Sequence, residues 1–308
     1  MLTLKKLPEE MEIKCTSRKW NPNHTPLQAY QLFVFIDKAY SYKNALLLQI
    51  MSKLNITILG SGTSQGVPVI ACPCEVCASH DLRDKRLRSS ILIESEKVTV
   101  VIDTGPDFRQ QMLREDVKKL DAVLITHSHK DHIAGMDDVR SFNFLTKKAM
   151  KVYAAPWDQE VIRREFSYAF EDKKYPGVPE IELINLDENE IKVKDLIIQP
   201  IPVKHRFLTV FAFRIGPFAY ITDANKISEK SMEALLGVKY LVIDALRREK
   251  HISHFNLEEA IEVSQKIGAE KTWFTHISHA MGQAMTINKT LPQGMQLAWD
   301  GMLISVDI

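Results

Sequence analysis

The stretch Thr126-His127-Ser128-His129-Lys130-Asp131-His132 places three imidazoles and a carboxylate within six residues. It follows the apolar run Ala122-Val123-Leu124-Ile125, which predicts a buried strand. Alternate side chains of an extended segment point to one side, so His127 and His129 can share one cation while Asp131 and His132 reach another. Two incomplete neighbouring metal sites leave room for a bridging water that becomes hydroxide near neutral pH, which indicates a hydrolytic centre.

The composition is that of a globular, enzyme-sized chain. Of the 308 residues, 45% are hydrophobic and 26% are charged, which is enough to bury one large core or two small ones. The net charge of +1 gives no reason to expect nucleic acid as an obligatory partner. The apolar segments Leu32–Ile36 and Ala45–Met51 are too short to span a bilayer.

Three of the four cysteines, Cys72, Cys74 and Cys77, fall within six residues. This spacing suits metal thiolates better than disulfides. We therefore expect a reducing compartment, the cytoplasm.

Residues 1–50 differ from the rest of the chain, because they are rich in Lys, Asn, Pro and Tyr and show no clear period. A strand is predicted directly after Met51. We expect an N-terminal extension over residues 1–50, which either precedes a natural start at Met51 or serves as a docking segment. We expect a hydrolase domain over residues 51–308.

From Leu54 onward, two strand-rich halves are each followed by helices, which predicts an α/β fold of two packed sheets with helices outside. Asn256 and Glu259 stand at capping-box spacing and predict the start of a helix that runs through Lys266. Further helices are expected near residues 107–118, 133–148 and 158–171. The predicted strands include 54–59, 90–94, 98–102, 151–155, 191–201, 210–215, 218–222, 240–246 and 271–276.

Three more polar residues follow apolar runs that predict strands. His205 follows residues 198–203, Asp223 follows residues 218–222, and His276 follows residues 273–275. Each stands where a buried strand reaches the surface, so together they can complete the two metal sites. Taken singly, each also suits a hydrogen-bonded histidine or a turn aspartate.

An H-x-H-x-D-H motif followed by a distant His, Asp and His resembles the metallo-β-lactamase superfamily, an αββα sandwich of metal-dependent hydrolases. The resemblance covers Leu54 to the carboxyl end. It implies that His127, His129 and His205 hold one metal, that Asp131, His132 and His276 hold the other, and that Asp223 bridges them. An aspartate bridge is typical of the phosphodiesterases and thioester hydrolases of the superfamily rather than of most true β-lactamases.

Four further segments are similar to the phosphoribosyl cyclic phosphate phosphodiesterases of the carbon-phosphorus lyase pathway. They are G-S-G-T-S-Q-G-V-P at residues 60–68, C-P-C-E-V-C at residues 72–77, T-H-I-S-H at residues 275–279 and W-D-G-M at residues 299–302. The resemblance implies a structural zinc on Cys72, Cys74, Cys77 and His279, with His80 as a competing local ligand. It also implies manganese in the active site, although such ligands suit zinc as well.

The same resemblance makes His254 the proton donor, with His251 as a weaker candidate, and makes Asp131 catalytic as a metal ligand. An imidazole titrates close enough to neutrality to supply a proton. Asp103 is expected to support a metal-binding histidine through its free ring nitrogen. Four arginines could contact substrate phosphate, although solvated surface charge explains each of them better: Arg86, Arg88, Arg247 and Arg248.

These features predict a hydrolase of a small phosphodiester, cyclic or open, that acts through a hydroxide on two metals. The alternatives are a tRNA-processing nuclease, a thioester hydrolase, an accessory protein of pyrroloquinoline quinone biosynthesis, and a catalytically silent metal-binding module. The near-neutral charge and the lack of a basic, aromatic-rich arm weigh against RNA. We expect no membrane partner, and many relatives of this kind pair as homodimers.

Overall fold

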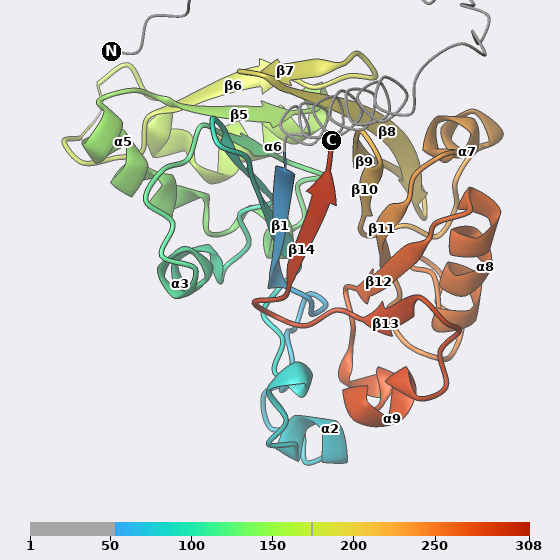
Figure 1. Ribbon diagram of the computed structural model, residues 1–308. Coiled ribbons are helices and arrows are strands. Elements are labelled where there is room, and N and C mark those ends of the chain that lie inside the picture. The colour runs from blue at the N-terminus through green and yellow to red at the C-terminus, as the bar shows by residue number, and fades with distance from the viewer. Residues whose placement is uncertain (1–52, 174) are drawn as a thin grey trace, which may run out of the picture. The chain divides into compact units, whose positions relative to one another are not determined.

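Two mixed β-sheets form the framework that positions the predicted site (Figure 1). The computed structural model describes residues 53–173 and 175–308. Each sheet has seven strands, in the orders β14-β1-β2-β3-β4-β5-β6 and β13-β12-β11-β10-β9-β8-β7. The strands of the first sheet are β1 (Lys53–Gly60), β2 (Ser90–Glu94), β3 (Thr99–Ile102), β4 (Ala122–Leu124), β5 (Met150–Ala154), β6 (Ile181–Asn185) and β14 (Leu303–Asp307).

The strands of the second sheet are β7 (Ile191–Val193), β8 (Leu196–His205), β9 (Leu208–Ile215), β10 (Phe218–Ile221), β11 (Tyr240–Asp244), β12 (Lys271–Thr275) and β13 (Met295–Leu297). The α-helices are α2 (Glu75–Ala78), α3 (Phe108–Arg114), α4 (Lys130–Ile133), α5 (Arg140–Thr146), α6 (Pro156–Glu165), α7 (Glu229–Leu235), α8 (Leu257–Ile267) and α9 (Ala284–Asn288). Four short 3₁₀ helices complete the described elements: η1 (Leu82–Asp84), η2 (Met136–Val139), η3 (Ser167–Ala169) and η4 (His279–Met281).

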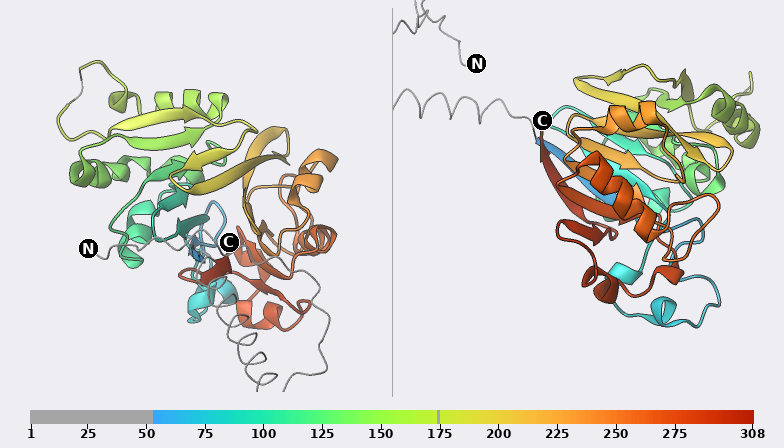
Figure 2. Two further views of the ribbon diagram at one scale, coloured as in Figure 1. Left: turned by 45° about the horizontal axis from the view of Figure 1, so that its top comes forward. Right: turned by 90° about the vertical axis from the view of Figure 1, so that its right-hand side faces the viewer.

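Apolar side chains fill the layer between the two sheets. Alternate residues of β1, such as Ile56 and Ile58, share this layer with Phe213 and Tyr220 of the second sheet. A second apolar layer lies between the second sheet and α7 and α8, and a third lies between the first sheet and α3, α5 and α6. Figure 2 shows the resulting order of helix, sheet, sheet and helix. The predicted αββα architecture is confirmed.

The parallel strands bring distant segments to one edge. In the first sheet β3 pairs in parallel with β4, and in the second sheet β10, β11 and β12 run parallel to one another. The loops that leave the carboxyl ends of parallel strands gather at the same edge of a sheet. The five loops that follow these strands contain most of the predicted site residues.

Two sequence predictions need correction or stay open. The helix expected over residues 133–148 is wrong, because the chain there forms α4, η2 and α5 in succession. The break lies at Gly135, where a Cβ would come within 2.1 Å of the carbonyl oxygen of Gly105. The predicted extension, residues 1–50, lies outside the described residues, so the domain boundary stays a prediction. Within the described part of the chain, no helix is long and apolar enough to cross a membrane.

Candidate metal centre

The histidine motif spans the end of the loop after β4 and the start of α4, with His127 and His129 in the loop and Asp131 and His132 in the helix. Thr126 anchors the start of this loop, because its amide and hydroxyl donate to the carboxylate of Asp103 at 2.9 and 2.8 Å. The amide of Ser128 donates at 2.9 Å to Asp158, in the first turn of α6. Both carboxylates are buried. The histidines on either side of Ser128 are therefore held in a fixed backbone frame.

The three distant ligands predicted from the sequence come from the second sheet. His205 is the last residue of β8, Asp223 follows β10, and His276 follows β12. Asp223 and His276 have left-handed backbone conformations, with φ of 50° and 56°. Residues other than glycine rarely adopt this conformation, and it turns the chain sharply where each strand ends. The structure thus brings all seven predicted ligands to one place.

The first group of donor atoms belongs to His127, His129, His205 and Asp223, and these atoms lie within 4.8 Å of one another. His127 Nε2 lies 3.0 Å from His129 Nδ1 and 3.8 Å from Asp223 Oδ2. The ring centroids of His129 and His205 are 5.2 Å apart. This is three imidazole nitrogens and one carboxylate oxygen, a set that suits a divalent cation.

The second group consists of Asp131, His132, Asp223 and His276, again within 4.8 Å. His132 Nε2 lies 3.2 Å from Asp131 Oδ2 and 3.3 Å from Asp223 Oδ1, and His276 Nε2 lies 3.2 Å from the same Asp223 oxygen. Asp223 directs Oδ1 to this group and Oδ2 to the first. It stands where a bridging ligand is needed.

Two of the donor atoms also lack hydrogen-bond partners, and a bound cation would take the place of those partners. Nε2 of His132 and Nε2 of His276 are buried and have no hydrogen-bond partner. A buried polar atom without a partner is costly, and a bound cation removes that cost. Burial opposes charge on these groups, yet the neighbouring carboxylates raise the pKa of His132 well above its ordinary value. The chain therefore concentrates negative charge where two cations would sit.

Outside the donor groups, further bonds fix the orientation of two histidine rings. His132 Nδ1 lies 2.7 Å from Asp103 Oδ2, so the supporting role expected for Asp103 agrees with its position. His205 Nδ1 lies 2.8 Å from the carbonyl oxygen of Ser253. In both rings Nδ1 is occupied by an acceptor, which leaves Nε2 as the ligand atom.

His254 stands beside the metal centre. Its ring centroid lies 4.7 Å from that of His276 and 4.6 Å from that of His205. His254 Nδ1 lies 3.2 Å from Asp244 Oδ2. Burial opposes protonation of this imidazole, but the charge and hydrogen bond of Asp244 raise its pKa to about 9. A protonated imidazole at this place can donate a proton to a departing group.

Sequence analysis missed Asp244, which lies inside the predicted strand over residues 240–246 rather than after it. The residue is fully buried at the end of β11, and it also accepts from the amide of Ala224 at 3.0 Å. His251, the weaker candidate for proton donor, lies 5.2 Å from His254 between ring centroids. Burial and the charge of His254 lower the pKa of His251.

A cavity of about 250 Å³ opens next to His254. Three loops form its walls: the glycine-rich loop after β1, the loop after β11 and the loop after β12. The glycine-rich loop passes close to its neighbour, since a Cβ on Gly60 would lie 1.9 Å from the carbonyl oxygen of Arg88. The lining residues are Thr63, Ser64, Gln65, Leu246, Arg247, His251, His254, Ser278, His279 and Ala280.

The four arginines proposed for phosphate contact differ in position. Arg247 lines the cavity. Arg86 is 3% exposed and donates to Ser61 Oγ and the Ala298 carbonyl, so it is neither free to bind phosphate nor a solvated surface charge. Arg88 is paired with the carboxylate of Asp107. Arg248 is exposed.

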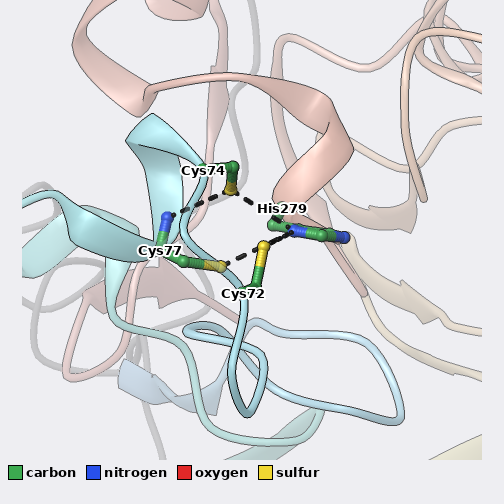
Figure 3. A group of neighbouring side chains, drawn as sticks. All are labelled: Cys72, Cys74, Cys77 and His279. Carbon is green, nitrogen blue, oxygen red and sulfur yellow. Dashed lines mark hydrogen bonds between the residues drawn. The ribbon is translucent and has the colours of Figure 1, made fainter.

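The cysteine cluster brings Cys72, Cys74 and Cys77 against His279 (Figure 3). The three sulfurs lie 3.2, 3.4 and 3.6 Å from Nδ1 of His279. These four residues form a group that could hold one metal, and His80 is not part of it. Three thiolates and one imidazole suit a closed tetrahedral zinc site.

Comparisons with known proteins agree with this geometry. The β-lactamase superfamily domain matches residues 98–277. A crystal structure of a diphosphatase of the PhnP family is 38% identical, has a TM-score of 0.79, and covers 84% of this chain and 99% of that one. Zinc-bound PqqB from Methylobacterium extorquens is 20% identical with a TM-score of 0.66, covers 81% of this chain and 99% of that one, and shares the fold.

Two curated relatives carry other names. An octanoyltransferase from Porphyromonas gingivalis is 36% identical over 253 residues, which is 81% of this chain and 51% of that protein. A ribonuclease Z from Bradyrhizobium sp. is 27% identical over 157 residues, which is 49% of this chain and 47% of that protein. The chain therefore spans about half the length of these curated relatives.

Proposed function

The chain belongs to the β-lactamase superfamily, and from this premise we propose that it is a metal-dependent hydrolase of small phosphodiesters. One arrangement carries the proposal. Two donor groups share Asp223, and His254 stands beside them at the wall of a cavity. A phosphodiester on the metals would thus have its leaving group next to a proton donor.

The residues have separate tasks in this proposal. The seven ligands would hold two divalent cations, manganese or zinc, at which the phosphate would bind. When bound, the cations polarise phosphorus, neutralise developing charge and activate a water as the nucleophile. His254 gives its proton to the oxygen of the departing alcohol. Asp244 holds Nδ1 of His254 and thereby keeps the ring protonated and oriented.

The cavity argues for a small leaving group. A water molecule occupies about 30 Å³ in the liquid, so the cavity has room for roughly eight waters. Its walls carry hydroxyl, amide, imidazole and guanidinium groups and few apolar side chains. Such a lining suits a polar, hydroxyl-bearing group better than an eight-carbon acyl chain.

The names of the relatives raise two alternatives. Octanoyl thioester chemistry is suggested by the Porphyromonas gingivalis relative, of which the chain matches half. RNA processing is suggested by the ribonuclease Z from Bradyrhizobium. The hydrogen-bonding groups at the cavity wall favour a phosphodiester over the first, and the net charge of +1 disfavours the second.

The test is hydrolysis of bis-p-nitrophenyl phosphate by protein reconstituted with Mn²⁺ or Zn²⁺, with the metal content of each sample measured. Asp131→Ala should abolish turnover and lower the metal content of the second group. His254→Ala should keep its metals and lose about 10²-fold or more in turnover of substrates with basic leaving groups. His80→Ala is the matched control and should behave as wild type. A fully metallated wild type without turnover would contradict the proposal, and octanoyl thioesters would then be assayed.

A further inference from the structure

Asn225 lies two residues beyond the bridging Asp223, in the loop between β10 and α7, and is half-buried. Its side chain bonds to two other loops. Asn225 Oδ1 accepts from the amide of Arg206 at 2.8 Å. Asn225 Nδ2 donates to the carbonyl oxygen of Ile252 at 3.0 Å. A single amide group therefore joins three loops of the site.

Each of the bonded loops contains a residue of the proposed machinery. Asn225 holds the backbone on both sides of His205, because its own amide also donates to the carbonyl of Lys204 at 2.8 Å. Ile252 stands directly before Ser253, whose carbonyl fixes the ring of His205, and two residues before His254. The side chain of Asn225 thus links a metal ligand to the proton donor.

The loop over residues 249–252 has few other attachments. Ile252 is 66% exposed, and Glu249 and Lys250 are exposed. The carbonyls of Glu249 and Lys250 accept from Arg247, which belongs to the same loop. Exposed segments with little apolar burial open at low free-energy cost. Of the hydrogen bonds described for residues 249–252, the one from Asn225 is the bond that joins them to a different loop.

We propose that Asn225 is a positioning residue that aligns His254 with the leaving group and His205 with its metal. The inference rests on the proposed phosphodiesterase function. Loss of the Asn225 donor would free residues 249–252, so that Ser253 and the ring of His254 would be held in place by fewer bonds. The steps that need a proton from His254 would then slow, while the metal ligands would remain.

Two substrates of similar shape separate this role from a merely structural one. Bis-p-nitrophenyl phosphate releases a weakly basic phenolate that needs little protonation, whereas diphenyl phosphate releases a more basic one. Asn225→Asp keeps the acceptor for Arg206 and removes the donor to Ile252. We expect this variant to lose about tenfold or more in kcat on diphenyl phosphate and less than about threefold on bis-p-nitrophenyl phosphate. Asn225→Ala also removes the acceptor for Arg206, so we expect it to add weaker metal binding to this selectivity. An equal loss on both substrates would overturn the proposal.

Hydrogen exchange supplies a readout that does not depend on turnover. The amides of Leu246, Phe255 and Leu257 flank the loop and are hydrogen-bonded. In the metal-loaded protein, Asn225→Asp should accelerate their exchange by about threefold or more. Asn189→Ala, an exposed asparagine between β6 and β7, is the control and should leave it unchanged. Unchanged exchange in Asn225→Asp would overturn the link between the loops. Accelerated exchange in a protein that hydrolyses no phosphodiester would retain the link and reject the proposed function.

Discussion

At the scale of single residues, Asp103 meets two requirements of the site, a left-handed backbone conformation and a charged acceptor for its neighbours. Its φ of 67° is left-handed, which aspartate and asparagine tolerate better than other side chains. Its carboxylate binds the loop through Thr126 and the ring through His132. An asparagine can keep the backbone conformation while it removes the charge.

We expect Asp103→Asn to weaken metal binding by about 10- to 100-fold at the group that includes His132, because the ring loses a charged acceptor. A competitive titration with a chromophoric chelator measures the affinity. Asp103→Ala should also lower the free energy of unfolding, since alanine tolerates the left-handed backbone poorly. Equal metal affinity in Asp103→Asn and wild type would contradict the supporting role.

A buried carboxyl far along the chain from the histidine motif makes stability depend on pH. The side chain of Asp300 is 9% exposed and accepts from the amides of Ser61 and Leu87. Burial raises the pKa of Asp300 from 3.8 to about 6. Because the folded state binds this proton more tightly than the unfolded chain, the contribution favours folding below pH 4 and is lost as the pH rises to about 6.

The shift corresponds to a contribution on the order of 3 kcal/mol. Urea unfolding of metal-free protein between pH 4 and pH 7 should show this loss of stability with rising pH in wild type and not in Asp300→Asn. The variant is expected to be less stable at every pH, because its amide nitrogen cannot accept from Leu87. The difference in slope between the two proteins is therefore the test, and equal slopes would refute the assignment.

The residues that sequence analysis found are those with a local signal. His127, His129, Asp131 and His132 stand in one motif, and each distant ligand follows an apolar run. Asp244 also follows an apolar run, but its role, like that of Asn225, depends on which loops meet in space. The burial of Arg86 could not be foreseen, because its sequence surroundings are polar, whereas its guanidinium is buried against the carbonyl of Ala298.

At the scale of elements, the cysteine segment around α2 has little apolar support. Its cluster of buried residues comprises Val67, Val76 and Cys77, and the helix has four residues. Asp84 adds one connection to the rest of the fold, since it accepts from Ser79 Oγ and from the amide of Ala284 at the start of α9. A metal bound by the thiolates would supply most of the remaining stability of this segment.

We therefore expect zinc loss to open this segment locally. In Cys74→Ser, a protease should cut within residues 69–85 much faster than in wild type, while residues 90–308 stay resistant. His80→Ala, which changes a histidine in the same segment, should be cut at the wild-type rate. Mass spectrometry of the fragments identifies the site. Full protection of the segment in zinc-free Cys74→Ser would contradict a structural role for the metal.

Strands were predicted better than helices, for a physical reason. Buried strands such as β2 and β11 are continuous apolar runs that the sequence displays directly. Helix α8 was predicted because its capping box is local, and both bonds between Asn256 and Glu259 are present. The break at Gly135 could not be foreseen, because it comes from a close approach to Gly105 in another loop.

At the scale of the whole molecule, the first and last described strands are neighbours at one edge of the same sheet. β1 pairs with β14 in antiparallel register from Lys53 with Asp307 to Thr57 with Leu303. Ile304 and Val306 of β14 are buried in the layer between the sheets. Both ends of residues 53–308 thus belong to one core, which needs β14 to cover one side of β1.

Two truncations test whether residues 51–308 form the complete hydrolase domain. A protein that starts at Met51 should keep its metal content, its turnover and its free energy of unfolding. Deletion of residues 303–308 should cost about 3–6 kcal/mol, because two buried aliphatic side chains are lost and an edge of the sheet is exposed. Urea unfolding of both proteins measures the difference. If removal of residues 1–50 proved as costly as removal of β14, those residues would be part of the hydrolase core, and the predicted boundary at Met51 would be wrong.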